Sequence, residues 1–302
     1  MAENTPTLRS SKIRIIAIAL LILTTVLWGT SFVFTKNLTQ DIPIFFYIGL
    51  RFAIALVGFI PFFPHLKHLN KHLALMSLVT GMLYFFGFAI QTIGLQTTTP
   101  GKTGFITGLS VIIVPFIAWL VFKKPVNKRI WIAVALSVGG MVFLLLEGKS
   151  GIIMGDLVVI VCAFFWAFYI IYNDKFVKLV DIYCYSIIQI IVICGTGFIF
   201  SFLIQESYGN LSFSPGFWFV MIYMGIIVMT LTILFQNWSQ QHVSATLTAI
   251  IFSLEPVFAV LFDFLIGGVI LSIFGWIGCI LIFIAIIIAI LKNIDNSEDL
   301  NQ

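Results

Sequence analysis

The sequence predicts an all-α integral membrane protein with about ten transmembrane helices. Of its 302 residues, 61% are hydrophobic and 9% are charged, and the mean hydropathy is +1.13. Soluble domains are about half apolar and a quarter charged, so this composition excludes a soluble protein. The apolar runs are each about 20 residues long, which is the length of a bilayer-spanning helix. They do not alternate in polarity like the shorter strands of an outer-membrane barrel.

Charged, polar and proline residues separate the apolar runs and mark the ends of the spans. Most connections are short, so consecutive helices are expected to be antiparallel neighbours. The first run follows basic residues, as in a signal peptide, but it is too long and lacks a cleavage site, so we expect a retained span. The expected spans are 15–34, 42–63, 73–95, 103–122, 130–146, 155–172, 180–204, 217–236, 245–266 and 270–291.

The distribution of basic residues predicts the orientation. Loops on one side carry twelve Lys and Arg residues, whereas loops on the other side carry three, which are Lys36, Lys102 and Lys149. Cytoplasmic loops carry the excess of Lys and Arg, so both termini of this multi-pass protein are expected on the cytoplasmic side of the plasma membrane. The net charge of +4 comes from these loops and not from one basic face, so nucleic acid is not an expected partner.

Similar segments recur in the two halves of the chain. Trp28 and Trp166 each begin an aromatic and polar stretch, and the offset in numbering between them also relates Arg51 to Gln189. Each half would contain five spans, an odd number, so the second half would enter the membrane inverted. We therefore expect two inverted five-helix repeats, 15–147 and 155–291. This plan is typical of secondary transporters with a substrate site near the membrane midplane.

Two prolines lie inside apolar runs, one in each half. The offset between Pro115 and Pro256 is nearly the same as that between the two tryptophans. A proline within a helix removes a backbone donor and clashes with the preceding turn, so both spans are expected to kink. We expect the two prolines to act as hinges.

Several neutral residues are candidates for the wall of a substrate cavity. The first and sixth spans each carry a polar stripe at helical spacing, which faces either a cavity or a packed neighbouring helix, because lipid cannot satisfy hydroxyl groups. Other hydrogen-bonding groups lie at similar depth, where they either contact substrate or satisfy kinked backbone. The neutral candidates are Trp28, Ser31, Tyr84, Gln91, Trp166, Tyr169 and Gln189.

Two charged residues lie near the middle of spans, where an unpaired charge is costly. Arg51 is either a clamp for a substrate carboxylate or phosphate, or a tether that holds its helix to neighbours. Glu255 has three possible roles: pairing with Arg51, carrying a coupling proton, or binding a substrate ammonium group. The expected partners are thus a small-molecule substrate, the lipid bilayer and protons.

Other chemistry is not indicated. The four cysteines lie in apolar segments without close spacing, which predicts neither disulfides nor a zinc site. His65, His68 and His72 lie in a basic interfacial loop, and we expect no metal there. The chain has no nucleotide-binding loop, catalytic triad or HExxH motif, so we expect neither an enzyme nor a cofactor.

Several motifs resemble those of EamA-type members of the drug/metabolite transporter superfamily. The similarity extends from residue 15 to about residue 291, and it implies ten helices in two inverted repeats and export or exchange of amino acids and other small metabolites. An acidic residue that often follows spans four and nine in this family is absent here. The motifs are Trp28-Gly-Thr-Ser-Phe with Lys36, Leu50-Arg51-Phe52, Thr98-Thr-Thr-Pro-Gly-Lys-Thr-Gly-Phe105, Trp166-Ala-Phe-Tyr and Leu254-Glu255-Pro256-Val257.

These observations together predict a secondary transporter that works by alternating access. The resemblance favours amino acids or related carboxylates as substrates, and export over uptake. Two alternatives stay open: a carrier of larger anionic metabolites or drugs, and a membrane scaffold that transports nothing.

Overall fold

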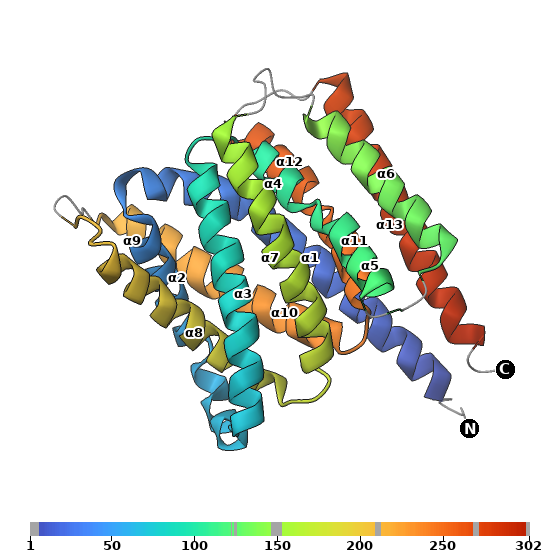
Figure 1. The fold of residues 1–302 in the computed structure, drawn as a ribbon, viewed down its shortest axis with the longest axis horizontal. Helices are drawn as coiled ribbons and strands as arrows, with labels where there is room; N and C mark the ends of the chain where they lie inside the picture. The colour runs from blue at the N-terminus through green and yellow to red at the C-terminus, as the bar shows by residue number, and fades with distance from the viewer. Residues whose placement is uncertain are drawn as a thin grey trace.

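The structure, a computed structural model, describes residues 6–121, 123, 126–145, 153–208, 213–267 and 272–299. The described part of the chain is a bundle of helices without a strand, coloured along the chain in Figure 1. The 3₁₀ helix is named η1 and the π-helical segment η2. The helices are α1 (Pro6–Asp41), α2 (Ile44–Gly58), η1 (Ile60–His68), α3 (Lys71–Leu95), α4 (Pro100–Thr107), α5 (Ser110–Leu120), α6 (Lys128–Leu145), α7 (Met154–Phe176), α8 (Ile182–Leu203), α9 (Pro215–Ile222), η2 (Tyr223–Thr230), α10 (Leu231–Gln240), α11 (Ala245–Phe252), α12 (Glu255–Gly267) and α13 (Ile273–Asp299).

Eight helical segments in the described residues are long and apolar enough to cross a bilayer. The pair α2 and η1 makes a ninth if it counts as one span, although the two helices meet at 86°. This bend has a local cause, because Pro61 is the second residue of η1 and Pro64 lies within it. The remaining expected span coincides with α6. The all-α membrane class is therefore confirmed, whereas ten crossings and their orientation stay predictions.

The fourth and ninth expected spans are each interrupted near their centre. The first is broken between α4 and α5 at Gly108 and Leu109, and the second between α11 and α12 at Ser253 and Leu254. One offset in numbering relates both residues of the first break to those of the second. Both spans are thus pairs of short helices whose ends meet inside the protein.

Equivalent capping residues begin the two broken spans. Thr99 accepts a hydrogen bond from the Lys102 backbone N–H, and Ser244 accepts one from the Leu247 backbone N–H. These caps are related by the same offset as the breaks, and they satisfy donors that a helix start leaves free. The prolines follow a different register, because Pro256 is the second residue of α12 whereas Pro115 lies further inside α5.

Helices from the two halves pack against each other throughout the bundle. Helix α3 packs on α7 and α8, α2 on α8, and α1 on α10 and α12, while α6 and α13 pair at one edge (Figure 1). Small residues allow close approach near the second break. A Cβ on Gly29 would lie 2.6 Å from Phe258 Cβ, and a Cβ on Gly104 would lie 3.1 Å from Pro256 Cα. Helices α1 and α4 therefore enclose the start of α12.

Candidate functional site

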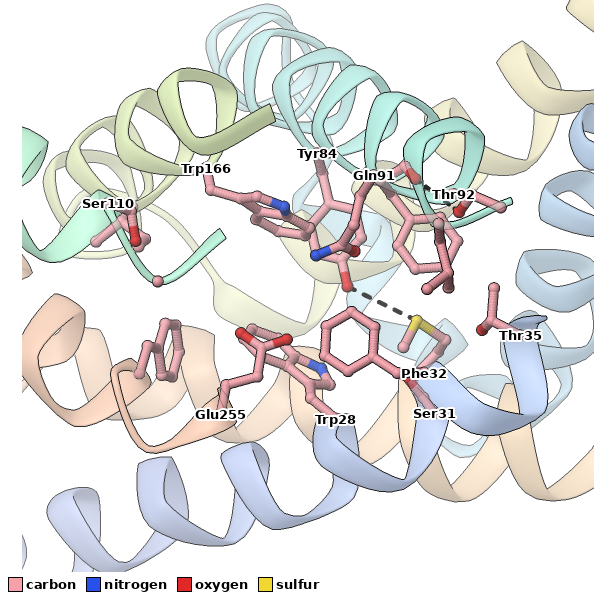
Figure 2. Close-up of a pocket in the computed structure, with 16 residues that line it drawn as sticks. Trp28, Ser31, Phe32, Thr35, Tyr84, Gln91, Thr92, Ser110, Trp166 and Glu255 are labelled. Atoms are coloured by element: carbon pink, nitrogen blue, oxygen red, sulfur yellow. Dashed lines mark hydrogen bonds between the residues drawn. The ribbon is translucent and has the colours of Figure 1, made fainter. Parts of the chain in front are cut away.

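A cavity lies at the centre of the bundle between α1, α3, α7 and the two helix breaks. Its empty space, including its open mouth, is about 600 Å³, of which about 30 Å³ can hold the centre of a water molecule. Figure 2 shows Trp28 and Glu255 on one side of this space and Trp166 and Tyr84 on the other. The cavity is thus a narrow chamber between elements of both halves, and six of its sixteen lining residues are aromatic.

Helix α3 forms one wall with a single face. Tyr84, Phe88, Gln91, Thr92 and Leu95 line the cavity and recur at i, i+4, i+7, i+8 and i+11, the spacing of one helical stripe. The Tyr84 hydroxyl donates to the Met229 sulfur at 3.7 Å. The Gln91 amide donates to the Thr107 hydroxyl at 2.9 Å. These contacts hold two polar groups of the wall in place.

The two tryptophans that occupy corresponding positions in the two halves meet in the cavity. The ring centroids of Trp28 and Trp166 are 6.0 Å apart, and both side chains are buried. The Trp28 indole N–H donates to the Thr232 hydroxyl at 3.1 Å, which fixes its ring. The Trp166 indole N–H has no hydrogen-bond partner among the described residues. Trp166 therefore offers a free donor in the wall of the cavity.

Glu255 is the only charged side chain among the described residues that line the cavity. It is the first residue of α12, directly after the break, and it is 7% exposed. Among the contacts of the described residues, its carboxylate makes no hydrogen bond or ion pair. The N-terminus of a helix favours a negative charge, so α12 supports an anion here without a side-chain partner. The carboxylate is therefore available to a cation or a proton.

Arg51 lies one side chain behind the cavity wall and is fully buried. Its Nη1 donates to Thr35 Oγ1 at 3.1 Å and to the Tyr47 hydroxyl at 2.7 Å. The guanidinium carbon is 5.0 Å from the centroid of the Phe88 ring, within the range of a cation–π contact. Nε and Nη2 have no partner among the described residues. Thr35 and Phe88 line the cavity, so the guanidinium is separated from it by these two side chains.

Arg51 and Glu255 do not form an ion pair with each other in the described part of the chain. The sequence alone leaves this pairing open as one of the alternatives for both residues. Tyr84 lies between their surroundings: it lines the cavity with Glu255, and its ring centroid is 6.4 Å from that of Phe88, which the Arg51 guanidinium contacts. The cavity has an acid in its wall and a cation close behind it.

A neutral cluster in the second half corresponds to the Arg51 cluster. The offset that relates the two tryptophans also relates Thr35, Tyr47 and Arg51 to Asn173, Tyr185 and Gln189, in that order. Asn173 Oδ1 lies 3.0 Å from the Tyr185 hydroxyl and 3.2 Å from Gln189 Nε2, which repeats the contacts of Thr35.

Further polar groups from α3 and α10 complete this second cluster. Gln189 Nε2 also donates to Thr80 Oγ1 at 2.8 Å, and Gln189 Oε1 accepts from Asn237 Nδ2 at 2.9 Å. All of these side chains are buried. Gln189 is therefore part of a closed amide network, and it does not line the cavity.

The structure thus brings some of the expected site residues together and separates others. Arg51, Tyr169 and Gln189 are outside the lining, and so are both prolines. Tyr169 packs behind the wall, with its ring 5.1 Å from that of Tyr84. The expected site residues that line the cavity are Trp28, Ser31, Tyr84, Gln91, Trp166 and Glu255.

Sequence reasoning missed several lining residues, including Ser110 and Phe88. Ser110 begins α5 as Glu255 begins α12, and the offset of the helix breaks relates these two residues. The same offset relates the two N-cap residues, Thr99 and Ser244, which can be recognised in the sequence just before the two apolar runs. Phe88 lies on the α3 stripe that Tyr84 and Gln91 already define.

Polar contacts also close one end of the bundle. Lys102 Nζ lies 3.4 Å from Asp156 Oδ2, and both side chains are buried. Thr98 donates its hydroxyl to Asp156 and accepts a hydrogen bond from Lys36 Nζ at its carbonyl, at 2.6 Å. A Cβ on Gly155 would lie 2.7 Å from Gly94 O. Helices α3, α4 and α7 are therefore tightly joined at this end.

Asp181 and His65 meet at the opposite end. His65 Nδ1 lies 2.9 Å from Asp181 Oδ2, and Asp181 Oδ1 accepts from the Cys184 backbone N–H at 2.9 Å. Partial burial acts to raise the pKa of Asp181. The hydrogen bonds from Cys184 and His65 outweigh that effect and hold this pKa below its ordinary value of 3.8.

A solved crystal structure has a similar fold, with a TM-score of 0.73 over 91% of this chain and 96% of that chain, at 17% identity. An uncharacterized transporter of Archaeoglobus fulgidus is 29% identical over 280 residues, 90% of this chain and 85% of that protein. The uncharacterized transporter YyaM of Bacillus subtilis is 26% identical over 252 residues, 80% of this chain and 81% of that protein. The EamA-like transporter family matches residues 15–146 and 153–291. With nearly the whole sequence matched, in two successive copies, the chain belongs to the EamA-like transporter family.

Proposed function

We propose that this protein is a secondary transporter that exports or exchanges small metabolites across the plasma membrane by alternating access. Its favoured substrates are amino acids or related carboxylates. In this proposal, ten spans form two inverted five-helix repeats, 15–147 and 155–291, and both termini are cytoplasmic.

The observation that carries the proposal is the unpartnered Glu255 in a central cavity lined by both halves. A carboxylate buried in a membrane protein is costly unless it has a partner, water or a task. The described residues provide no partner, and the aromatic walls give an apolar surface for the rest of a substrate. A carrier that binds a cationic group or a proton at this point explains the residue.

The two charges suggest how an amino acid would lie. Its ammonium group would contact Glu255, while its carboxylate would approach Arg51 past Thr35 and Phe88. Arg51 uses only Nη1 in hydrogen bonds to described residues, so Nε and Nη2 can receive a carboxylate. The Trp166 indole N–H provides one further donor.

The two helix breaks supply the moving parts of this proposal. Short helices can change their relative angle where their backbone is already interrupted, with Pro115 and Pro256 as hinges close to the breaks. The end that carries Lys102 and Asp156 would face the outside and is closed by a buried ion pair. Opening toward the outside would require that pair to separate.

A counterflow experiment tests the proposal. Purified protein in liposomes that are preloaded with unlabelled substrate should accumulate labelled substrate from a panel of amino acids and organic acids. Liposomes without protein give the baseline. Accumulation of at least one compound, strongly reduced in Glu255→Gln, is the expected result. A folded wild-type protein that accumulates no member of the panel above baseline would refute this assignment.

A further inference from the structure

Three side chains with metal-binding chemistry meet at the end of the molecule opposite the Lys102–Asp156 pair. They are His65 and His68 of η1 and Asp181 at the start of α8. One ligand atom from each lies within 4.8 Å of the other two. We propose that these three residues bind one divalent transition-metal ion of the zinc class. This site is separate from the central cavity and independent of the proposed transport.

Local backbone geometry brings the two histidines together. They are three residues apart in η1, and a 3₁₀ helix has three residues per turn, so residues i and i+3 lie on the same side. Their ring centroids are 6.0 Å apart. In a regular α-helix the same two residues would be rotated away from each other by about 60°. The unusual helix type is therefore what aligns them.

Asp181 is fixed by its role as the N-cap of α8. Its Oδ1 accepts from the Cys184 N–H, which directs Oδ2 toward His65 at 2.9 Å. An aspartate carboxylate is ionised at neutral pH, because its ordinary pKa is about 3.9. An ionised carboxylate and two neutral imidazoles form a donor set suited to Zn²⁺, Co²⁺ or Ni²⁺, whereas Mg²⁺ and Ca²⁺ prefer oxygen ligands.

The site is open to solvent. A groove with about 940 Å³ of empty space, including its open side, lies beside it and is lined by His68, His72, Asp181 and Lys178, among others. Water can therefore fill the remaining coordination positions of an ion. The nearby cation Lys178 is paired with Asp174 at 2.8 Å, which reduces its repulsion of a metal ion. His72 shares the groove but is outside the group whose ligand atoms converge.

Binding would join the two halves of the chain. The histidines lie in the first half and Asp181 in the second, 116 residues from His65 along the sequence. An ion bound only by the folded protein raises its stability in proportion to the logarithm of its concentration. Metal binding at this site should therefore raise the melting temperature as well as produce a direct binding signal.

The test uses the full-length protein in detergent, with any polyhistidine tag removed and residual metal stripped by a chelator. Zn²⁺ titration by calorimetry and Co²⁺ titration by absorption should both give one equivalent of bound ion per chain. His68→Gln should weaken binding about tenfold or more, because it removes a direct ligand. His72→Gln is the matched control, since it removes an imidazole from the same groove, and it should bind as the wild type does.

Asp181 needs a variant that separates metal binding from helix capping. Asp181→Ser removes the carboxylate but keeps a side-chain oxygen that can cap α8. Without metal it should melt somewhat below the wild type, because its contact with His65 is lost, and Zn²⁺ should produce no increase in its melting temperature. The proposal is overturned if wild-type protein binds no more metal than the His65→Gln/His68→Gln double variant. It is also overturned if His72→Gln weakens binding as much as His68→Gln.

Discussion

Replacing Glu255 by glutamine removes the charge from the cavity wall and preserves the size of the side chain. The carboxylate makes no hydrogen bond or ion pair with described residues, so its loss should not weaken the fold. The unfolding free energy should stay unchanged or rise, because a buried charge is eliminated. The substrate, in contrast, should lose its main electrostatic interaction with the protein.

The size of the binding defect follows from the charge-assisted hydrogen bond between a carboxylate and an ammonium group, because the neutral amide of glutamine is a weaker acceptor. Such a bond, when buried, contributes about 1.5–3 kcal/mol. At about 1.4 kcal/mol per tenfold change in affinity, Glu255→Gln should weaken binding of an amine substrate by about 10- to 150-fold. Calorimetry in detergent measures the affinity, and half-saturation of counterflow in liposomes provides the transport counterpart. Melting temperature, measured in the same detergent, reports on the fold.

Glu206→Gln is a matched control for the same chemical change. Glu206 accepts from the Phe45 and Phe46 backbone N–H groups at 2.9 Å each, so it holds the start of α2. This variant should lose about 1 kcal/mol of stability and keep its substrate affinity. The reasoning about Glu255 would be refuted if Glu255→Gln bound and transported substrate like the wild type. A large fall in its melting temperature would also refute it, because the carboxylate would then be structural.

Three further results are expected. Gly29→Ala should cost about 1–3 kcal/mol of stability in a thermal melt, because its Cβ would lie 2.6 Å from Phe258 Cβ. Gly139→Ala is the control and should not destabilise the protein, because nothing lies within 4 Å of its Cβ. Equal losses in the two variants would contradict the packing of α1 on α12. In a background without native cysteines, Ser31→Cys should react with a water-soluble thiol reagent and be protected by substrate. Tyr169→Cys should react far more slowly. Faster reaction of Tyr169→Cys than of Ser31→Cys would contradict the placement of Ser31 in the cavity wall. The folded-state pKa of Asp181 lies below its unfolded value of about 3.8, so the unfolded chain takes up a proton first as the pH falls. The stability due to this group is fully present above that unfolded value and is lost as the pH falls through the lowered pKa. Denaturation of wild type and Asp181→Asn should therefore converge in acid, and a difference that persisted there would contradict this origin.

The sequence predicts the fold class and the centre of the cavity because both depend on regular spacing. Long apolar runs define the helices, and the recurrence of similar segments in the two halves brings Trp28 and Trp166 together. The helix breaks were placed less well, because prolines are conspicuous but do not set the break. Pro115 is accommodated within α5, while the interruption falls earlier, at Gly108. Ser110 was missed for this reason.

Contacts between distant residues were the least predictable part of the site. Depth in the membrane suggested that Arg51 and Glu255 could pair, but depth does not define direction. Arg51 is on a face of α2 directed at Thr35 and Tyr47, and these hydroxyls satisfy one guanidinium nitrogen without an acid. Gln189 similarly joins an amide network. The residue types were informative, whereas the rotation of each helix about its axis was set by packing.

The two corresponding clusters have different charges, and this difference makes the halves of the chain non-interchangeable. The first half contributes a guanidinium at residue 51 and a serine at residue 110. The second half contributes an amide at residue 189 and a carboxylate at residue 255. A protein assembled from two copies of the first half would bury two positive charges at these positions and no negative one. At these positions the native protein balances one charge of each sign only because its halves have diverged, so each half depends on the other for electrostatic neutrality there.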